Sequence, residues 1–386
     1  MLHNPMIADV EIDLRVLRHN VEQLATLVFP SATWPVIKAN AYGHGLIEVG
    51  RALAPVVDGI CVYRASEGIA LREAGVAAPI LVLGPIEPRE LEAAHRAQLT
   101  VTLWETGSYR ADAARIARRR GTPLRVHAKV DTGVTRLGLD APRASSAIAE
   151  LLDDPHLHVE GVFTHLAAVE ELESAFTFEQ LMRFESALAP IDGVLRERGV
   201  RRHSAASAAA MLVPQSRLDL VRPGIATYGI WPSPQTQATA GGSIELAPVL
   251  SWHTQLVVVR DVEAGRSVGY GCTYYTTRPS RIAVVPIGYA EGIPRAVSNT
   301  GAMLVHGRRA PIVGRVCMDV TMLDVTEIPQ AQPGSRVTLI GSDGDEVLTA
   351  DHWAQWADTI SYEIVARLPE TVPRRYLMPM EAATKG

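Results

Sequence analysis

Lysine is scarce in this chain of 386 residues. Lysine and arginine together number 37, but only three of them are lysine: Lys38, Lys129 and Lys385. A coding bias toward arginine explains most of this scarcity, because arginine replaces a surface lysine at little cost. An internal lysine that persists is therefore a candidate for chemistry closed to a guanidinium. An amine can lose its proton, attack a carbonyl carbon and form a Schiff base, whereas arginine stays charged.

Cysteine, basic excess and long apolar runs are also lacking. Cys61, Cys272 and Cys317 are odd in number and widely spaced, which favours reduced thiols in a cytoplasmic protein over a disulfide framework. No run of about 18 apolar residues occurs, so no membrane span is expected. The N-terminus shows no signal-peptide pattern. A net charge of −5 offers no basic surface for nucleic acid.

Common nucleotide and metal motifs are absent as well. Neither a GxGxxG after the first predicted strand nor a P-loop is present, which counts against the nucleotide-binding folds. The twelve histidines show no HExxH or other paired spacing. We therefore predict no metal site.

What the sequence does have is a regular alternation of strands and helices over residues 9–230. Eight short runs, mostly rich in Val, Ile or Leu, are PVIKAN, DGICVY, PILVLG, LTVTLW, LRVHAKVD, HVEGVFTH, RRHSAAS and LDLVRPGI. Helical segments such as ASEGIALREAG and EPRELEAAHRAQ lie between them. The alternation predicts a parallel sheet, and eight units in roughly 220 residues fit a (β/α)₈ TIM-type barrel. A doubly wound open sheet is the alternative.

The pattern changes after Trp231. The segment PSPQTQATAGGS is typical of a linker, and β-branched runs broken by Gly and Pro follow it. Residues 349–358 begin with Thr and Asp and predict a helix. We therefore expect the (β/α)₈ barrel over residues 1–240 and a mainly β C-terminal domain over residues 241–386.

Polar residues cluster where the predicted strands end, which is where a barrel carries its chemistry. They are Lys38, Lys129, Asp131, Arg136, Thr164, His165, His203, Ser204, Ser207 and Arg222. Both internal lysines fall at this rim, so strand pattern and lysine scarcity agree independently. Gly224 follows the last run, and the loops after strands seven and eight of such barrels frequently bind phosphate. An ordinary left-handed turn at Gly224 is the alternative.

Longer motifs resemble those of bacterial alanine racemases. VIKANAYGHG at 36–45 is similar to the cofactor-lysine motif of that family, and GRVCMD at 314–319 is a second long match. Shorter matches lie at 129–133 with Arg136, and at 164–165, 221–224, 270–271, 288–290 and 361–363. The resemblance implies a barrel with a C-terminal β domain. It also implies a head-to-tail homodimer whose active sites are shared between chains.

The resemblance further implies pyridoxal 5'-phosphate as cofactor and a role for each matching position. Lys38 resembles the lysine that holds the cofactor as an aldimine, and Arg222 the arginine at the pyridine nitrogen, with His165 beside it. Tyr270 resembles the second catalytic base, donated by the partner chain. The positions that match phosphate contacts are Tyr42, Ser207, Gly224, Ile225 and Tyr362.

Three further positions match groups around the substrate. Arg136 and the Met318 amide resemble contacts to the substrate carboxylate. Lys129 resembles a lysine that is often carbamylated and that positions the arginine matching Arg136. A plain contact between Lys129 and Asp131 is the alternative.

The chain departs from the family pattern in places. Ala206 stands where the family has Asn, Glu291 where it has Asp, and Thr371 where it has Arg. These changes bear on substrate preference and rate, and not on the reaction class.

The chemistry explains why these residue types are needed. Racemisation requires one proton carrier on each face of a planar carbanion, which the cofactor stabilises. We expect Lys38 to take the proton of the D-enantiomer and Tyr270 that of the L-enantiomer. A phenol needs nearby positive charge to act as a base, and a chain from Tyr270 through His165 to Arg222 would supply it. An arginine cannot readily protonate the pyridine nitrogen, which favours racemisation over transamination.

The expected function is interconversion of L- and D-alanine, supplying D-alanine for peptidoglycan. One alternative is a broader racemase that also takes serine or other small amino acids. A barrel decarboxylase is disfavoured, because Arg222 stands where such enzymes have a carboxylate. A non-enzymatic pyridoxal-phosphate carrier is the alternative from another class, although such carriers lack a second domain.

Overall fold

The computed structural model describes residues 8–171 and 174–378, which form two compact units. The barrel unit comprises Val16–Ala41 and Leu46–Ala247. The β unit contains the described residues of Met1–Arg15, Tyr42–Gly45 and Pro248–Gly386. We predicted a boundary near residue 240; the long C-terminal part of the β unit begins at Pro248.

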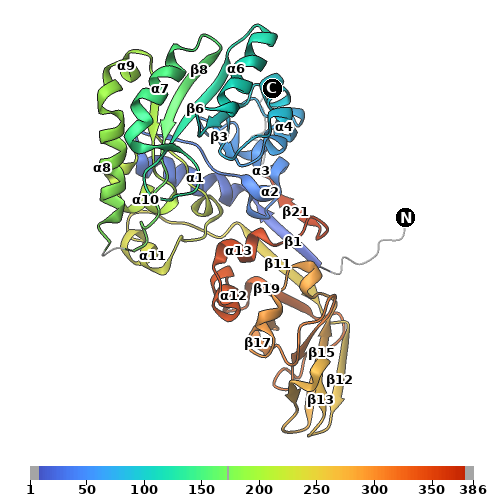
Figure 1. Ribbon diagram of the computed structural model, residues 1–386. Coiled ribbons are helices and arrows are strands. Elements are labelled where there is room, and N and C mark those ends of the chain that lie inside the picture. Colours follow the sequence, from blue (N-terminus) through green and yellow to red (C-terminus); the bar gives the residue numbers. More distant parts are fainter. Residues whose placement is uncertain (1–7, 172–173, 379–386) are drawn as a thin grey trace, which may run out of the picture. The chain divides into compact units, whose positions relative to one another are not determined.

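Parallel strands form a closed ring in the barrel unit (Figure 1). In ring order they are β2 (Ala32–Thr33), β3 (Ile60–Val62), β4 (Ile80–Val82), β5 (Thr100–Leu103), β6 (Leu124–Asp131), β8 (Leu157–Phe163), β9 (Arg201–His203) and β10 (Leu220–Val221). The amide of Ile37 donates to Cys61 O at 2.8 Å, which joins the chain after β2 to β3. The amide of Arg222 donates to Ala205 O at 2.9 Å, which joins the ends of β9 and β10. The (β/α)₈ prediction is confirmed, and the open sheet was wrong.

Helices cover the outside of these strands (Figure 1). They include α1 (Leu14–Val28), α3 (Leu46–Leu53), α4 (Ala65–Glu73), α5 (Pro88–Arg96), α6 (Ser108–Arg120), α7 (Ala144–Asp153), α8 (Phe176–Leu188), α9 (Asp192–Glu197) and α10 (Ser207–Leu212). Every residue of β3, β4 and β5 is buried, as expected for strands covered on both faces.

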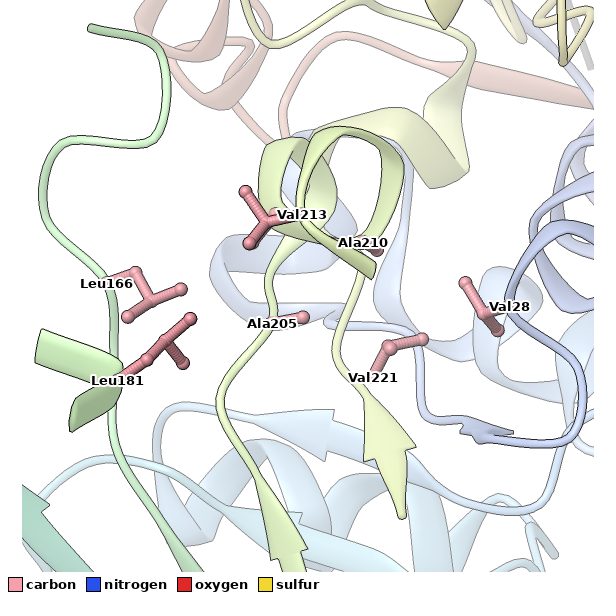
Figure 2. Close-up of a cluster of buried hydrophobic side chains, with 8 residues drawn as sticks. Val28, Leu166, Leu181, Ala205, Ala210, Val213 and Val221 are labelled. Carbon is pink, nitrogen blue, oxygen red and sulfur yellow. The ribbon is translucent and has the colours of Figure 1, made fainter. Parts of the chain in front are cut away.

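A cluster of buried side chains fixes α10 against the ends of β9 and β10. Its members are Val28, Leu166, Leu181, Ala205, Ala209, Ala210, Val213 and Val221. Figure 2 shows Ala210 of α10 and Val213, which follows that helix, close to Ala205 and Val221 at the ends of the two strands. Because Ser207 begins α10, this packing also fixes the position of its hydroxyl.

Besides the two-stranded pair β13 (Ser267–Val268) and β14 (Tyr274–Tyr275), the described part of the β unit contains two sheets of three or more strands. The larger has the order β17 (Arg308–Pro311), β16 (Ala302–Val305), β19 (Arg336–Asp343), β11 (Leu250–Gln255), β1 (Ala8–Asp13) and β21 (Arg374–Leu377). The smaller has the order β12 (Val258–Val262), β15 (Ser280–Val285) and β18 (Thr321–Asp324). The predicted helix at 349–358 is confirmed as α12 (Ala350–Ala357), where the Thr349 hydroxyl accepts from His352 N at 3.3 Å. A second helix, α13 (Ser361–Ala366), follows it.

Two local predictions were wrong. The segment predicted as a linker contains α11 (Pro234–Ala240), because Ser233 caps its start, Pro234 suits a first turn, and Thr236 and Ala240 are buried. The first barrel strand was predicted at residues 35–40, but the strand in the structure lies earlier in the chain. Strand β2 ends at Thr33, and Lys38 begins the short helix α2 (Lys38–Tyr42).

Candidate functional site

Lys38 opens a backbone turn of the left-handed kind. The φ angles of Ala39, Asn40, Ala41 and Tyr42 are 53°, 53°, 54° and 52°. Each non-glycine residue in this region costs about 1–2 kcal/mol, so surrounding bonds must hold the turn. One such bond joins Leu46 N to Asn40 Oδ1 at 2.8 Å, and another joins Ala41 N to Ile37 O at 3.0 Å.

Four cationic side chains act on His165 from the C-terminal rim of the barrel. Burial, followed by the charges of Arg222, Arg136, Lys129 and Lys38, lowers the pKa of His165 to about 3. His165 is therefore neutral near pH 7. Burial, followed by the charge of Arg136, also lowers the pKa of Lys38. The structure thus brings five predicted site residues into one neighbourhood, where positive charge would favour an anionic ligand.

Arg222 is buried at the centre of this neighbourhood. Burial lowers its pKa to about 10, so it stays charged at neutral pH. Its guanidinium donates to His203 Nδ1, to Thr164 O at 2.9 Å and to Ser204 O at 3.2 Å. It also lies 5.0 Å from the ring centroid of Phe163. These bonds lock its orientation.

Two buried histidines extend the chain of hydrogen bonds into the barrel. His203 Nε2 lies 2.9 Å from His127 Nδ1. Burial, then neighbouring charges with that of Arg201 first, lowers the pKa of His127 to about 3, and burial followed by the charge of Arg222 places that of His203 well below its usual range. Because Arg222 only donates, His203 must accept at Nδ1 and carry its proton on Nε2, which donates to His127. Both rings are neutral with defined tautomers.

His127 was not predicted as part of this site. The available signal is its spacing of two from Lys129 within β6, because alternate residues of a strand share a face. Gly161 on the neighbouring strand leaves room for the ring, since a Cβ there would lie 2.6 Å from His127 Cε1.

Two backbone amides converge on the Ser207 hydroxyl beyond the ends of β9 and β10. The Ser207 hydroxyl accepts from Gly224 N at 2.9 Å and from Ala226 N at 3.3 Å. Both amides belong to the start of the 3₁₀ helix η4 (Ile225–Tyr228), and Ser207 begins α10, so the starts of two helices meet at one hydroxyl. Gly224 has a φ of −101°, so the alternative of a left-handed turn was wrong.

Lys129 is buried near Arg136. Its Nζ donates to Leu137 O, and burial lowers its pKa to about 8 against the opposing charge of Asp131. The Asp131 carboxylate instead accepts from the amides of Gly133, Thr135 and Arg136, at 2.9, 3.1 and 3.2 Å. Asp131 therefore shapes the loop that carries Arg136.

The remaining predicted residues belong to the β unit. The rings of Tyr42 and Tyr362 lie 6.3 Å apart, and burial raises the pKa of Tyr42. Tyr270 begins the 3₁₀ helix η5 (Tyr270–Cys272) and is 74% exposed, while Met318 is 55% exposed. Ala290 N donates to Met318 O at 3.0 Å, which ties the loop of Met318 to the predicted motif at 288–290.

Among residues 8–171 and 174–378, no group of three or more His, Cys, Asp or Glu side chains could hold a metal ion. Within the same ranges, no helix has the length and apolarity needed to span a bilayer.

Two family models match the chain. Residues 12–232 match the alanine racemase N-terminal domain, and residues 249–376 match the alanine racemase C-terminal domain. An alanine racemase of Symbiobacterium thermophilum is 43% identical over 370 residues, covering 95% of this chain and 96% of the relative. One from Halothermothrix orenii is 39% identical over 368 residues, covering 95% and 96%.

Solved structures agree with this assignment. The alanine racemase of D-cycloserine-producing Streptomyces lavendulae has a TM-score of 0.87 and 34% identity, covering 98% of this chain and 99% of that one. The Bacillus anthracis alanine racemase with bound L-Ala-P has a TM-score of 0.87 and 34% identity, covering 96% and 94%.

Proposed function

We propose that this chain, which belongs to the alanine racemase family, is an isomerase that interconverts L-alanine and D-alanine. The observation that carries the proposal is the neighbourhood of His165. It combines a lysine of lowered pKa with a fixed arginine and two further cations. An amine of lowered pKa is more often neutral, and only the neutral amine attacks an aldehyde.

The residues present fit pyridoxal 5'-phosphate. Lys38 would bind its aldehyde carbon, and Arg222 would donate to its ring nitrogen. Ser207 with the amides of Gly224 and Ile225 would hold the phosphate, aided by the phenols of Tyr42 and Tyr362. The convergence of amides on the Ser207 hydroxyl supports this assignment, because phosphate needs several donors in one place.

Two proton carriers complete the proposed mechanism. The bound cofactor supplies an electron sink that stabilises the carbanion left when the α-proton departs. Lys38 Nζ takes the proton from D-alanine, and the Tyr270 phenol of the partner subunit takes it from L-alanine. Arg136 and the Met318 amide hold the substrate carboxylate. The exposure of Tyr270 and Met318 on the β unit supports a role toward a second subunit.

The histidine chain gives Arg222 a specific chemical role. Arg222 remains a donor, and the rings of His203 and His127 are neutral, so none of these groups offers an acidic proton to the cofactor ring nitrogen. A carboxylic acid there would strengthen the sink and allow protonation of the cofactor in place of the substrate. We infer that this arrangement favours racemisation over transamination.

We further propose that Lys129 is carbamylated. The neutral amine adds to carbon dioxide, forming an N–C bond and releasing one proton. A pKa of about 8 leaves a useful neutral fraction near physiological pH, and the charges of Arg136 and Arg222 would stabilise the negative product. The carbamate would then orient the Arg136 guanidinium.

Membership of the family also supports a proposal for the oligomeric state, the location and the metabolic role. We propose a cytoplasmic homodimer with shared active sites that supplies D-alanine for peptidoglycan. A broader racemase that accepts serine remains the second candidate, because Ala206 departs from the family pattern beside the proposed phosphate site.

Spectroscopy and product analysis test the proposal together. Purified chain incubated with pyridoxal phosphate should become yellow and lose that absorbance on borohydride treatment. Peptide mass spectrometry should then find the label on Lys38. Racemisation of L-alanine, followed by optical rotation, should exceed that of L-serine. Protein that stays colourless and inactive would refute both the cofactor and the reaction. Protein that is labelled on Lys38 but inactive would instead support the alternative of a non-enzymatic pyridoxal-phosphate carrier.

A further inference from the structure

Glu67 makes a contact outside the helix that it caps. It is the third residue of α4, and its Oε2 accepts from the amides of Tyr63 and Arg64, both at 2.9 Å. Those two bonds satisfy the start of its own helix. Its Oε1 accepts from Ala39 N at 2.7 Å, 28 residues earlier in the chain. A capping role alone does not require this third bond.

The third bond lies directly beside the proposed cofactor lysine. Ala39 follows Lys38 and is the first of four left-handed residues. Because the turn is strained, its direction depends on the groups that hold it. A bond from an amide to a carboxylate is roughly twice as strong as one between neutral groups, so Glu67 is well suited to hold the start of the turn.

Glu67 also reaches the amine by two other routes. It fixes the backbone of Tyr63, whose ring centroid lies 5.8 Å from Lys38 Nζ. In addition, the negative charge of Glu67 raises the pKa of Lys38, against the lowering by burial and by Arg136. One carboxylate therefore holds the backbone next to Lys38, fixes the backbone of its aromatic neighbour Tyr63 and contributes a charge that acts on the Lys38 amine.

We propose that Glu67 is a positioning residue for Lys38, which aims the amine through the Ala39 backbone and acts on it through its negative charge. The catalytic consequence rests on the proposed function. If Lys38 takes the α-proton of D-alanine, a change in its direction or protonation alters that step in particular.

The scarcity of lysine allows a direct measurement on the protein without cofactor. Labelling with ε-¹³C-lysine gives three signals, and Lys38→Arg identifies one of them by its loss. Glu67→Gln should lower the pKa of Lys38 by about one pH unit, the low end of the effect of an opposite charge within a few ångströms. An unchanged titration would overturn the role of the charge.

Glu90→Gln is a matched control. Glu90 holds the same position in α5, where its Oε2 accepts from Glu87 N at 3.3 Å. The charge of Glu67 acts on the Lys38 amine, whereas Glu90 lies on the next helix along the chain. Glu90→Gln should therefore disturb a helix start in the same manner and leave the Lys38 signal unmoved. A shift of equal size in this variant would show that the effect is only structural.

Hydrogen exchange tests the backbone part of the proposal. The Ala39 amide should exchange slowly in the native chain and faster by about tenfold in Glu67→Gln, because the neutral amide oxygen of glutamine accepts more weakly than a carboxylate. Glu67→Asp serves if the glutamine variant does not fold, because it keeps the charge and withdraws the carboxylate from Ala39. Rapid exchange in the native chain would overturn the proposal.

Kinetics with the cofactor-loaded enzyme separates this proposal from the proposed function. Glu67→Gln should increase the primary deuterium isotope effect for α-deuterated D-alanine more than that for L-alanine. Equal changes would show that Glu67 does not act through Lys38. A chain that takes up no pyridoxal phosphate would refute the proposed function, yet the titration and exchange results on Lys38 and Ala39 would stand.

Discussion

At the scale of single residues, the hydrogen bonds around Arg222 are determined by the fact that a guanidinium can only donate. Arg222 fixes the tautomer of His203, and His203 in turn fixes that of His127. None of this depends on a formal negative charge near Arg222. The arginine is instead held by carbonyl oxygens and an imidazole.

Arg222→Glu should shift the products from racemised alanine toward transamination. A carboxyl group would supply a proton to the cofactor ring and lose the bonds to Thr164 and Ser204. We expect racemisation to fall about 10- to 100-fold, which corresponds to about 1.4–2.7 kcal/mol, while pyruvate rises. Chromatography of both products measures the ratio. Arg222→Gln is the control, because it removes the cation and adds no acid; a similar ratio in all three proteins would contradict the idea.

Carbamylation of Lys129 should increase with pH. Its pKa of about 8 means that the reactive neutral amine is a minor form at pH 6.5 and the major form at pH 8.5. With ¹³C-bicarbonate, a carbamate signal should grow over this interval and vanish in Lys129→Ala, whose KM for alanine should rise about tenfold through loss of about 1.4 kcal/mol. Lys385→Arg controls for other amines. A signal that persists in Lys129→Ala would assign the carbamate elsewhere.

At the scale of elements, the sequence predicts strands better than the site's turn. Runs of Val, Ile and Leu mark β3–β6 and β8 because burial on both faces demands apolar side chains. The weak run RRHSAAS was placed mainly by its position, and β9 confirms it. The left-handed turn after Lys38 has no such signal. Alanine favours right-handed helices, and the bonds that override this preference come from Glu67 and Asn40, which only the fold brings into place.

Asn40→Ala should destabilise the lysine turn. The change removes the acceptor for Leu46 N and places a less tolerant residue at a φ of 53°. We expect the free energy of unfolding in urea to fall by about 1–2 kcal/mol. Asn40→Gly loses the same bond and relieves the left-handed cost, so it should fall less. Equal losses in the two variants would show that the backbone cost is negligible.

At the scale of the whole molecule, acid stability depends on the buried imidazoles. His127 and His165 have pKa values of about 3, against about 6.5 when unfolded. The unfolded chain therefore binds more protons between pH 3 and 6.5, and stability falls as the pH is lowered through this window.

Each of these groups should cost about 1 kcal/mol of unfolding free energy per pH unit below 6.5. Urea titrations at pH 7, 6 and 5 measure the slope. His127→Asn keeps an acceptor for His203 but does not titrate, so its slope should be shallower. A native stability that does not change between pH 7 and 5 would contradict neutral imidazoles.

A shared active site predicts complementation between two inactive dimers. Lys38→Ala and Tyr270→Phe should each lower racemisation by at least about 100-fold, equivalent to about 2.7 kcal/mol. Mixing and reassembling the two proteins should restore part of the activity, because half of the sites in a hybrid dimer would pair a native Lys38 with a native Tyr270. The double variant mixed with native protein is the control. Hybrids that stay inactive would place Tyr270 in the same subunit as Lys38, or outside the site.

Strand β1 has a consequence for how the chain is synthesised. Its ladder partners are β11, which starts at Leu250, and β21, which ends at Leu377. A ribosome therefore releases the first strand long before it makes either neighbour, whereas α1 and the strands of the barrel unit find their partners earlier. Vectorial synthesis would let the barrel assemble while the edges of β1 are still unpaired, and translation must pass Leu377 before the sheet around β1 can close.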